Sequence, residues 1–433
     1  MNSRTRALAE SDHRHLWHPF TPMRLWLDGA PLIIAEAEGN ELIDTEGRRY
    51  LDGVSSLWTN VHGHRVPEID AAIRQQLDQV AHTTLLGLMS VKSIELAERL
   101  VGITPDPLTR VFFSDSGSTA TEVALKIAFQ CQQQRGHRAR TRFAAFQEAY
   151  HGDTLGSVSV GGIDLFHEIY RPLLFGAVRF PAPERRDAND ETRCLAEIDR
   201  LLDVHGDELA AFIFEPLVQG AAGMRMHSPP FLDAVLERCR RRGLLLVADE
   251  VATGFGRTGT MFAIDQIATV PDVLCLAKGL SGGYLPIAAT LTTEAIFESF
   301  RGPYEQHRTL FHGHTYTGNA LACAAALASL DRFVDARLIE TLPDKIEALA
   351  SALEMLPHVA ERRQTGLMAG AVLANPRGEP RLGHRVCLAA RRHGAIVRPL
   401  GDVVVLMPPL AMTPDEIRLL GRAVASAIVD CQG

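Results

Sequence analysis

The chain has 433 residues and a formal net charge of -8, from 52 acidic and 44 basic side chains. With 46% hydrophobic and 22% charged residues, its composition is that of a globular protein long enough for two domains. The acidity and the lack of a basic patch argue against nucleic-acid binding, because phosphate contacts need grouped lysine and arginine side chains.

Apolar runs of strand length alternate with helical patterns through the middle of the chain, which favours an α/β fold with a mostly parallel sheet. The predicted strands are Arg110–Ser114, Arg142–Phe146, Leu209–Phe214, Leu244–Ala248 and Val273–Leu276. The clearest predicted helices between them are Thr119–Gln134 and Pro229–Arg242.

From Ala336 onward the pattern is typical of a smaller α+β domain. It predicts a long helix, short strands at Leu367–Leu373 and Val403–Leu406, and a closing helix from Pro414. We therefore expect a large domain over residues 55–335 and a small domain built from both termini, residues 1–54 and 336–433.

The cysteines and the N-terminal region predict the compartment. Seven dispersed cysteines form no CxxC pair and no Cys/His ligand spacing, so we expect reduced thiols and no metal. The first 20 residues contain no apolar signal segment, and no stretch approaches the roughly 18 apolar residues that span a bilayer. We expect a soluble cytoplasmic protein that uses small-molecule substrates, without nucleic acid or membrane partners.

Only four lysines stand against 40 arginines, so chemistry that needs a primary amine has four possible positions. Lys92 begins a predicted helix, Lys126 lies within one, and Lys345 is expected on a surface helix. Lys278 follows a buried strand and enters a glycine-rich turn, where burial lowers the amine pKa and makes it a better nucleophile. If any lysine here forms a Schiff base, we expect it to be Lys278.

Two carboxylates, Asp249 and Glu250, follow an apolar strand at the edge where open α/β sheets place their ligands. Because successive side chains of a strand point to opposite faces, they cannot both address one ligand. A single carboxylate at a dry sheet end is what a protonated pyridine nitrogen requires. The alternative is a carboxylate that caps the following turn.

Two small-residue turns are candidate anion sites. Phe113–Ala120 leads from a strand into a helix, so its free N–H groups can face a phosphate, although such turns also serve as plain helix caps. Gly254–Gly259 matches G-x-G-x-x-G, the dinucleotide fingerprint. Several residues separate it from its strand, and the sequence after it opens a helix poorly, which disfavours a dehydrogenase.

Asp249, the Gly254–Gly259 run and Lys278 together resemble the class III, or omega, aminotransferases, which use pyridoxal 5'-phosphate on the type I fold. Further motifs are similar to the branch that converts 8-amino-7-oxononanoate to 7,8-diaminononanoate in biotin synthesis. These motifs are Leu16–Thr21, Ser55–Gly63, Tyr150–Thr154, Val218–Met224, Gly313–Asn319 and Arg398–Gly401. The resemblance runs from about His15 to the final helix and implies a homodimer with shared active sites.

The resemblance implies roles for the residues around the cofactor ring. Lys278 would attach the cofactor and move the substrate proton, and Asp249 would keep the ring nitrogen protonated. Tyr150 would stack on one face of the ring and Val251 on the other. Asp153 would support these residues from behind.

At the phosphate end, the resemblance implies that Gly117 and Ser118 bind the cofactor, joined by Thr315 from the partner subunit. His314 is the neighbouring cofactor-site position. Glu215, after the strand Leu209–Phe214, would support the site from behind.

For the substrate, Arg398 would pair with the carboxylate of the keto acid, which suits its planar fork. The other expected substrate contacts are Phe20, Leu57, Trp58, Tyr150 and Gly313. Many S-adenosylmethionine-using members carry Tyr at position 20, a second Trp at position 57 and Pro at position 314. Here Phe20, Leu57 and His314 stand instead, and these positions are more similar to members that use lysine as donor.

The resemblance thus implies an aminotransferase that moves an amino group from S-adenosylmethionine or lysine to 8-amino-7-oxononanoate by a ping-pong mechanism. The alternatives are another omega aminotransferase acting on a diamine, β-alanine or 4-aminobutyrate, an inactive pyridoxal-binding regulator, and the dehydrogenase.

Overall fold

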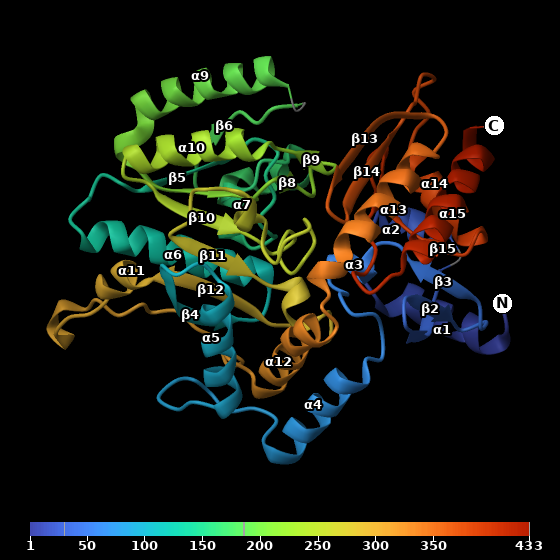
Figure 1. Cartoon of the computed structure of the whole chain (residues 1–433), viewed down its shortest axis with the longest axis horizontal. Coiled ribbons are helices and arrows are strands. Elements are labelled where there is room, and N and C mark those ends of the chain that lie inside the picture. Colours follow the sequence, from blue (N-terminus) through green and yellow to red (C-terminus); the bar gives the residue numbers. More distant parts are fainter. Residues whose placement is uncertain (30, 185–186, 433) are drawn as a thin grey trace.

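The computed structural model describes residues 1–29, 31–184 and 187–432. Its largest layer is a seven-stranded sheet in the order β4-β12-β11-β10-β7-β5-β6 (Figure 1). The strands are β4 (Leu108–Ser114), β5 (Arg142–Phe146), β6 (Ala177–Phe180), β7 (Leu209–Phe214), β10 (Leu245–Asp249), β11 (Val273–Leu276) and β12 (Ala288–Thr293). β12 runs antiparallel to β11 and β4, and the other neighbouring pairs are parallel. The prediction of a mostly parallel sheet is confirmed.

Both faces of this sheet are covered, which explains its nearly continuous apolar strands. Leu245 and Val247 of β10 pack in the cluster that contains helix α6 (Gly117–Gln134). The alternate residues Leu246 and Ala248 pack in the cluster that contains α10 (Pro229–Arg241). Helix α9 (Ala188–His205) lies beside α10 at the same face (Figure 1).

The two ends of the chain share a second sheet, in which β1 (Ile34–Glu38), β2 (Glu41–Asp44) and β3 (Arg49–Asp52) are joined by β15 (Ala395–Ile396). A third sheet contains β13 (Val359–Thr365), β14 (Met368–Leu373), β17 (Val403–Leu406) and β16 (Arg398–Leu400). Helices α13 (Leu342–Glu354) and α14 (Leu382–Arg392) both pack on α15 (Pro414–Gln432). Figure 1 shows these segments side by side, in blue and in orange to red. Domain boundaries at residues 55 and 336 stay a prediction.

The structure describes further α-helices and one further pair of strands. The helices are α1 (Ser3–His15), α2 (Met23–Leu27), α3 (Ser55–Trp58), α4 (Pro67–Gln79), α5 (Val91–Ile103), α7 (Leu155–Val160), α8 (Asp164–His167), α11 (Glu294–Glu298) and α12 (Ala320–Asp335). Strands β8 (Val218–Gln219) and β9 (Arg225–Met226) form a short antiparallel pair.

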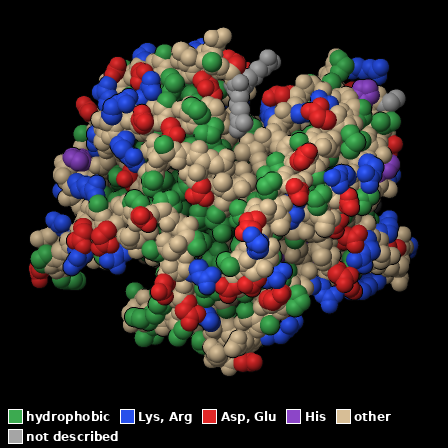
Figure 2. All heavy atoms as spheres, in the orientation of Figure 1, with side chains coloured by type: hydrophobic (Ala, Val, Ile, Leu, Met, Phe, Trp, Pro, Cys, Tyr) green, Lys and Arg blue, Asp and Glu red, His purple; other side chains and the backbone are tan. Residues whose placement is uncertain are grey.

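The surface carries interspersed charges of both signs on the face shown in Figure 2. All seven cysteines are free thiols, and six of them are buried. Within the three described ranges, no helix combines the length and the apolar character that crossing a membrane requires.

The expected surface position of Lys345 is wrong. The residue does lie on a helix, α13, but it is only 8% exposed, and its Nζ donates to the carbonyl of Leu410 at 2.5 Å. Burial lowers the pKa of this amine. The segment that contains Leu410, which is distant in the sequence, covers this face of the helix. The charged residues next to Lys345 in the sequence do not indicate this contact.

Candidate active site

A cavity of about 460 Å³ lies where the central strands end. Residues at or soon after the ends of β4, β5, β7, β10 and β11 line it, because parallel strands bring their carboxyl ends to one edge. The predicted site residues that line it are Phe20, Leu57, Trp58, Gly117, Ser118, Tyr150, Glu215, Asp249, Val251, Lys278 and Arg398.

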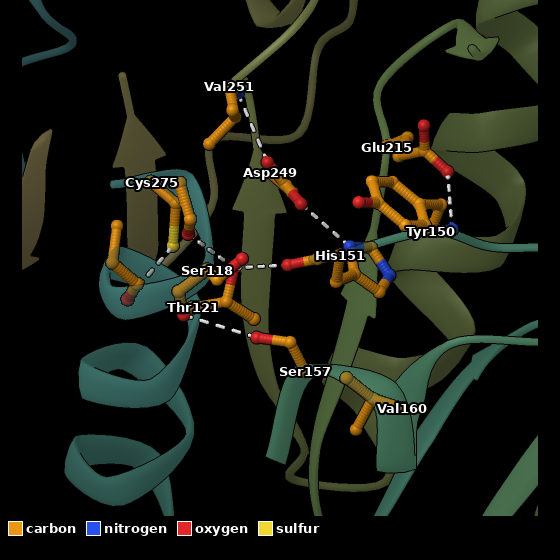
Figure 3. A network of polar contacts seen from close by, with 12 residues as sticks. Ser118, Thr121, Tyr150, His151, Ser157, Val160, Glu215, Asp249, Val251 and Cys275 are labelled. Carbon is orange, nitrogen blue, oxygen red and sulfur yellow. Dashed lines mark hydrogen bonds and ion pairs between the residues drawn. The ribbon is translucent and has the colours of Figure 1, made fainter. Parts of the chain in front are cut away.

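Asp249, at the end of β10, is 5% exposed and faces this cavity. Its Oδ1 accepts the N–H of Val251 at 3.1 Å, and its Oδ2 lies 2.7 Å from Nδ1 of His151 (Figure 3). Glu250 points elsewhere, where it accepts hydrogen bonds from Thr253 Oγ1 and the N–H of Ile264, both at 2.7 Å. As strand alternation predicts, Asp249 alone of the pair addresses the cavity.

His151 is a functional candidate that the sequence motifs did not identify, because its position next to Tyr150 is compatible with a purely structural histidine. It is 3% exposed, and its ring lies beside Asp249 in Figure 3. Its carbonyl accepts the hydroxyl of Thr121 at 3.1 Å, and its Nε2 has no hydrogen-bond partner within the described chain. An imidazole that donates from Nδ1 keeps the Asp249 carboxylate oriented. Its partner Asp249 lies 98 positions further along the chain, so no local pattern links the two residues. The one sequence signal for His151 is its position next to Tyr150.

Lys278 follows β11 and is the one lysine of the four that lines the cavity. Burial lowers the pKa of its amine, while the carboxylates of Asp249 and Glu215 act in the opposite direction. Nζ lies 4.9 Å from the ring centroid of Trp58. The amine is thus held among carboxylates and an aromatic ring, where a lowered pKa favours the nucleophilic neutral form.

The N-terminus of α6 forms one end of the cavity. Ser116 caps the helix by accepting the N–H of Thr119, and Gly117 is its first residue, so the N–H groups of Gly117 and Ser118 are available to an anion. A Cβ at Gly117 would lie 2.5 Å from Cγ1 of Val251, so only glycine permits this close approach. Ser118 accepts the N–H of Asp153 on its Oγ at 3.1 Å.

Tyr150 and Glu215 form a second group of linked side chains. The Tyr150 hydroxyl donates to Oδ2 of Asp153 at 2.7 Å, and burial together with this bond raises the pKa of the phenol. Glu215 accepts the N–H groups of Tyr150 and Gly220, each at 3.0 Å. Burial raises the pKa of Glu215 to about 7.

The remaining wall of the cavity is mostly apolar. Phe20 and Phe166 meet edge to face with centroids 5.3 Å apart, and Leu57 and Leu400 also line the space. Arg398, from β16, adds a guanidinium that has no ion pair with any described residue. The cavity therefore offers an apolar wall and, on Arg398, a guanidinium without an ion pair among the described residues, which together suit a carboxylate on an aliphatic chain.

Three predicted residues lie apart from this cavity within the chain. Gly313 and Thr315 are exposed, and neither they nor His314 line it. His314 Nε2 approaches a cavity-lining residue, Asp115, to 3.9 Å from Oδ1. The Thr315 carbonyl lies 2.8 Å from Nε2 of His82.

The glycine run Gly254–Gly259 does not form a dinucleotide site. It lies in turns, and the next helical element is a short 3-10 segment at Ala263–Gln266. Within the run, Arg257 is buried and donates to the carbonyls of Pro408 and Asn60 at 2.6 and 2.7 Å. The run thus ties separate segments together, and no helix N-terminus is present to bind a pyrophosphate.

The fold and this site are those of a cofactor-dependent transferase, and comparison with known proteins gives its class. The model of the class-III aminotransferases matches residues 26–428, so the chain belongs to this family.

Relatives and solved structures cover nearly the whole chain. It is 59% identical to an adenosylmethionine-8-amino-7-oxononanoate aminotransferase from Nitratidesulfovibrio vulgaris, over 99% of this chain and 82% of the relative. The enzyme of the same name from Geobacter sulfurreducens is 49% identical, over 96% of each chain. The crystal structure of the Methanocaldococcus jannaschii enzyme of that name has 42% identity and a TM-score of 0.94, over 99% of this chain and 100% of the other. A PLP-bound amine transaminase from an uncultivated Pseudomonas species has 36% identity and a TM-score of 0.89, over 96% and 98%.

Proposed function

We propose that the protein transfers an amino group from S-adenosylmethionine to 8-amino-7-oxononanoate, giving 7,8-diaminononanoate for biotin synthesis. The observation that carries this proposal is one cavity that joins Lys278 and Asp249 to the free guanidinium of Arg398 through apolar walls. The names of relatives with up to 59% identity support both substrates.

The residues of the cavity fit pyridoxal 5'-phosphate. The close approach of Val251 to Gly117 leaves a cradle that a Cβ would fill, beside the free N–H groups at the start of α6. Asp249 supplies a carboxylate for a protonated ring nitrogen, and Lys278 supplies the amine. When bound, the cofactor withdraws electrons from the substrate carbon that loses a proton.

The side chains then have separate tasks. Lys278 binds the cofactor through Nζ and moves a proton to and from the substrate Cα, for which its lowered pKa is suited. Asp249 would hold the proton on the ring nitrogen, and His151 would keep the Asp249 carboxylate in place. Tyr150 and Val251, which both line the cavity, would hold the ring and exclude water from the reacting atoms.

The acceptor matches the apolar half of the cavity. 8-Amino-7-oxononanoate carries its carboxylate at the far end of an aliphatic chain, so Arg398 would bind the carboxylate while Phe20, Leu57 and Trp58 contact the chain. Burying the methylenes stabilises this pose by about 0.8 kcal/mol each.

We further propose a homodimer in which Gly313, His314 and Thr315 of one subunit complete the cavity of the other. This proposal is supported by the contact between the segments of His82 and Thr315, in which the His82 ring bonds the Thr315 carbonyl. Residues close to either one in the sequence expose large apolar side chains. These are Leu86 (89% exposed), Met89 (70%), Phe311 (75%) and Tyr316 (60%). An apolar patch of this kind marks an interface. The protein would work in the cytoplasm, with residues 55–335 as the cofactor-binding domain.

The proposal is tested with purified enzyme, 8-amino-7-oxononanoate and a panel of donors. We expect diaminononanoate with S-adenosylmethionine. Product with lysine alone would move the donor assignment to lysine, for which the sequence at Phe20 and Leu57 argues. No product with any donor, but turnover of a diamine, β-alanine or 4-aminobutyrate, would contradict the acceptor assignment.

A further inference from the structure

The turn that carries Leu57 and Trp58 into the cavity has an unusual backbone. Ser55, Ser56 and Trp58 have φ values of +52°, +60° and +65°, in a region that residues other than glycine rarely adopt. Ser56 combines its φ with a ψ of -59°, the geometry of the rare and strained γ-turn of positive φ. Such a backbone persists only where surrounding groups hold it.

Asp52, the last residue of β3, supplies these groups. Its Oδ1 accepts the N–H of Ser56 at 2.7 Å, and its Oδ2 accepts the Ser56 hydroxyl at 3.0 Å. The same Oδ2 lies 3.2 Å from Nε2 of His64. Asp52 is fully buried, and its own N–H donates to the carbonyl of Asn40 at 2.9 Å. One carboxylate anchored in a sheet therefore accepts hydrogen bonds from both donors of the strained residue, its N–H and its hydroxyl.

Trp58 transmits the position of this turn to the reacting atoms. Its N–H donates to the carbonyl of Val54 at 2.9 Å, which fixes the turn closely around it. A Cβ at Gly220 would lie 3.1 Å from Cζ3 of the indole, and Nζ of Lys278 lies 4.9 Å from the ring centroid. Because Trp58 is only 7% exposed, a shift of the turn would move this buried ring relative to Lys278.

We propose that Asp52 is a positioning residue for the substrate wall. By holding Ser56 in its strained conformation, it sets Trp58 against Lys278 and directs Leu57 into the cavity. Asp52 does not itself line the cavity, so it acts through Trp58. The kinetic consequence rests on the proposed function, whereas the structural consequence is independent of any substrate.

The test compares Asp52→Asn, the double variant Asp52→Asn with Ser56→Gly, and the control Asp44→Asn. Asparagine removes the charge and replaces one of the two accepting oxygens with an amide N–H₂, which cannot accept a hydrogen bond from Ser56. Glycine adopts a positive φ without a Cβ penalty, so it relieves the strain that Asp52 holds. Asp44 is an equally buried aspartate on neighbouring β2 that bonds Arg48 and Tyr50 and does not line the cavity.

The first measurement is the fluorescence of Trp58 in a Trp17→Phe and Trp26→Phe background. Asp52→Asn is expected to shift the emission to longer wavelength as the indole leaves its enclosed position, and Ser56→Gly to restore it. Asp44→Asn is expected to leave the emission unchanged. An unshifted emission in Asp52→Asn, a shift of equal size in Asp44→Asn, or no restoration by Ser56→Gly would each overturn the proposal.

The second measurement is steady-state kinetics with 8-amino-7-oxononanoate. Asp52→Asn is expected to lower kcat/KM by about 10- to 100-fold, mainly through KM, because a misplaced wall residue weakens binding and orientation. Equal kcat/KM in Asp52→Asn and the parent overturns the inference. A parent enzyme that lacks turnover refutes the proposed function and leaves the fluorescence comparison to decide the role of Asp52. If Asp52→Asn does not fold, Ser56→Ala, which removes the hydroxyl contact, is measured in its place with the same criteria.

Discussion

Replacing His151 tests how much cofactor binding and catalysis depend on its hydrogen bond to the Asp249 carboxylate. The 2.7 Å contact joins two side chains that are 3% and 5% exposed, so water does not replace the lost hydrogen bond. A hydrogen bond to a charged group contributes about 1.5 to 3 kcal/mol. His151→Leu should therefore weaken cofactor binding, kcat/KM or both by about 10- to 100-fold. His151→Asn should retain most of both, because its side-chain amide N–H₂ takes the place of Nδ1.

The assay measures the Kd for pyridoxal 5'-phosphate by titration of the apoenzyme, followed by kcat/KM. A useful control is His62→Leu, since His62 bonds Ser329 Oγ at 3.0 Å and does not line the cavity. It should lower stability while leaving the cofactor Kd unchanged. Equal losses in His151→Leu and His151→Asn would refute the reasoning, because volume rather than the hydrogen bond would then explain the effect.

Three further changes probe other parts of the site. Gly117→Ala places a Cβ 2.5 Å from Val251 Cγ1 and should weaken cofactor binding by about 10-fold or more, whereas the control Gly102→Ala meets nothing within 4 Å; equal Kd values would contradict this. Burial raises the pKa of Glu250 from 4.5 to about 7, so its contribution to stability is present below pH 4.5 and lost as pH rises through 7. Measured by urea unfolding, the free energy of unfolding of the wild type should therefore fall by about 3 kcal/mol relative to that of Glu250→Gln between pH 4.5 and 7. Parallel plots of this free energy against pH for the two proteins would exclude the effect. Arg398→Met should raise KM for 8-amino-7-oxononanoate by about 100-fold with a smaller effect on kcat, and an unchanged KM would remove Arg398 from carboxylate binding.

The sequence predicts those parts of the fold that local patterns encode. The apolar runs mark β5, β7 and β11 at the observed bounds, because strands buried on both faces leave a continuous signal. β12 is less visible, since its Ala288–Thr293 run mixes small and polar residues and lacks a continuous apolar stretch. The terminal strand β1 is mostly exposed, and β2 and β3 are short and largely half-buried, so none of them has a continuous apolar run.

For the site, the sequence predicts those residues that lie at the ends of apolar strands. Asp249 and Lys278 each follow an apolar strand, and side-chain alternation separates Asp249 from Glu250. Contacts between distant segments are not encoded locally. The residues near His151 in the sequence do not indicate its hydrogen bond to Asp249. The residues near Lys345 likewise do not indicate that the segment of Leu410 buries it.

The most direct test of the central claim is where the cofactor attaches. Purified holoenzyme is reduced with borohydride, digested, and the labelled peptide is sequenced by mass spectrometry. We expect the label on Lys278, the one lysine that lines the cavity. A label on Lys92, Lys126 or Lys345, or no label at all, would contradict the account.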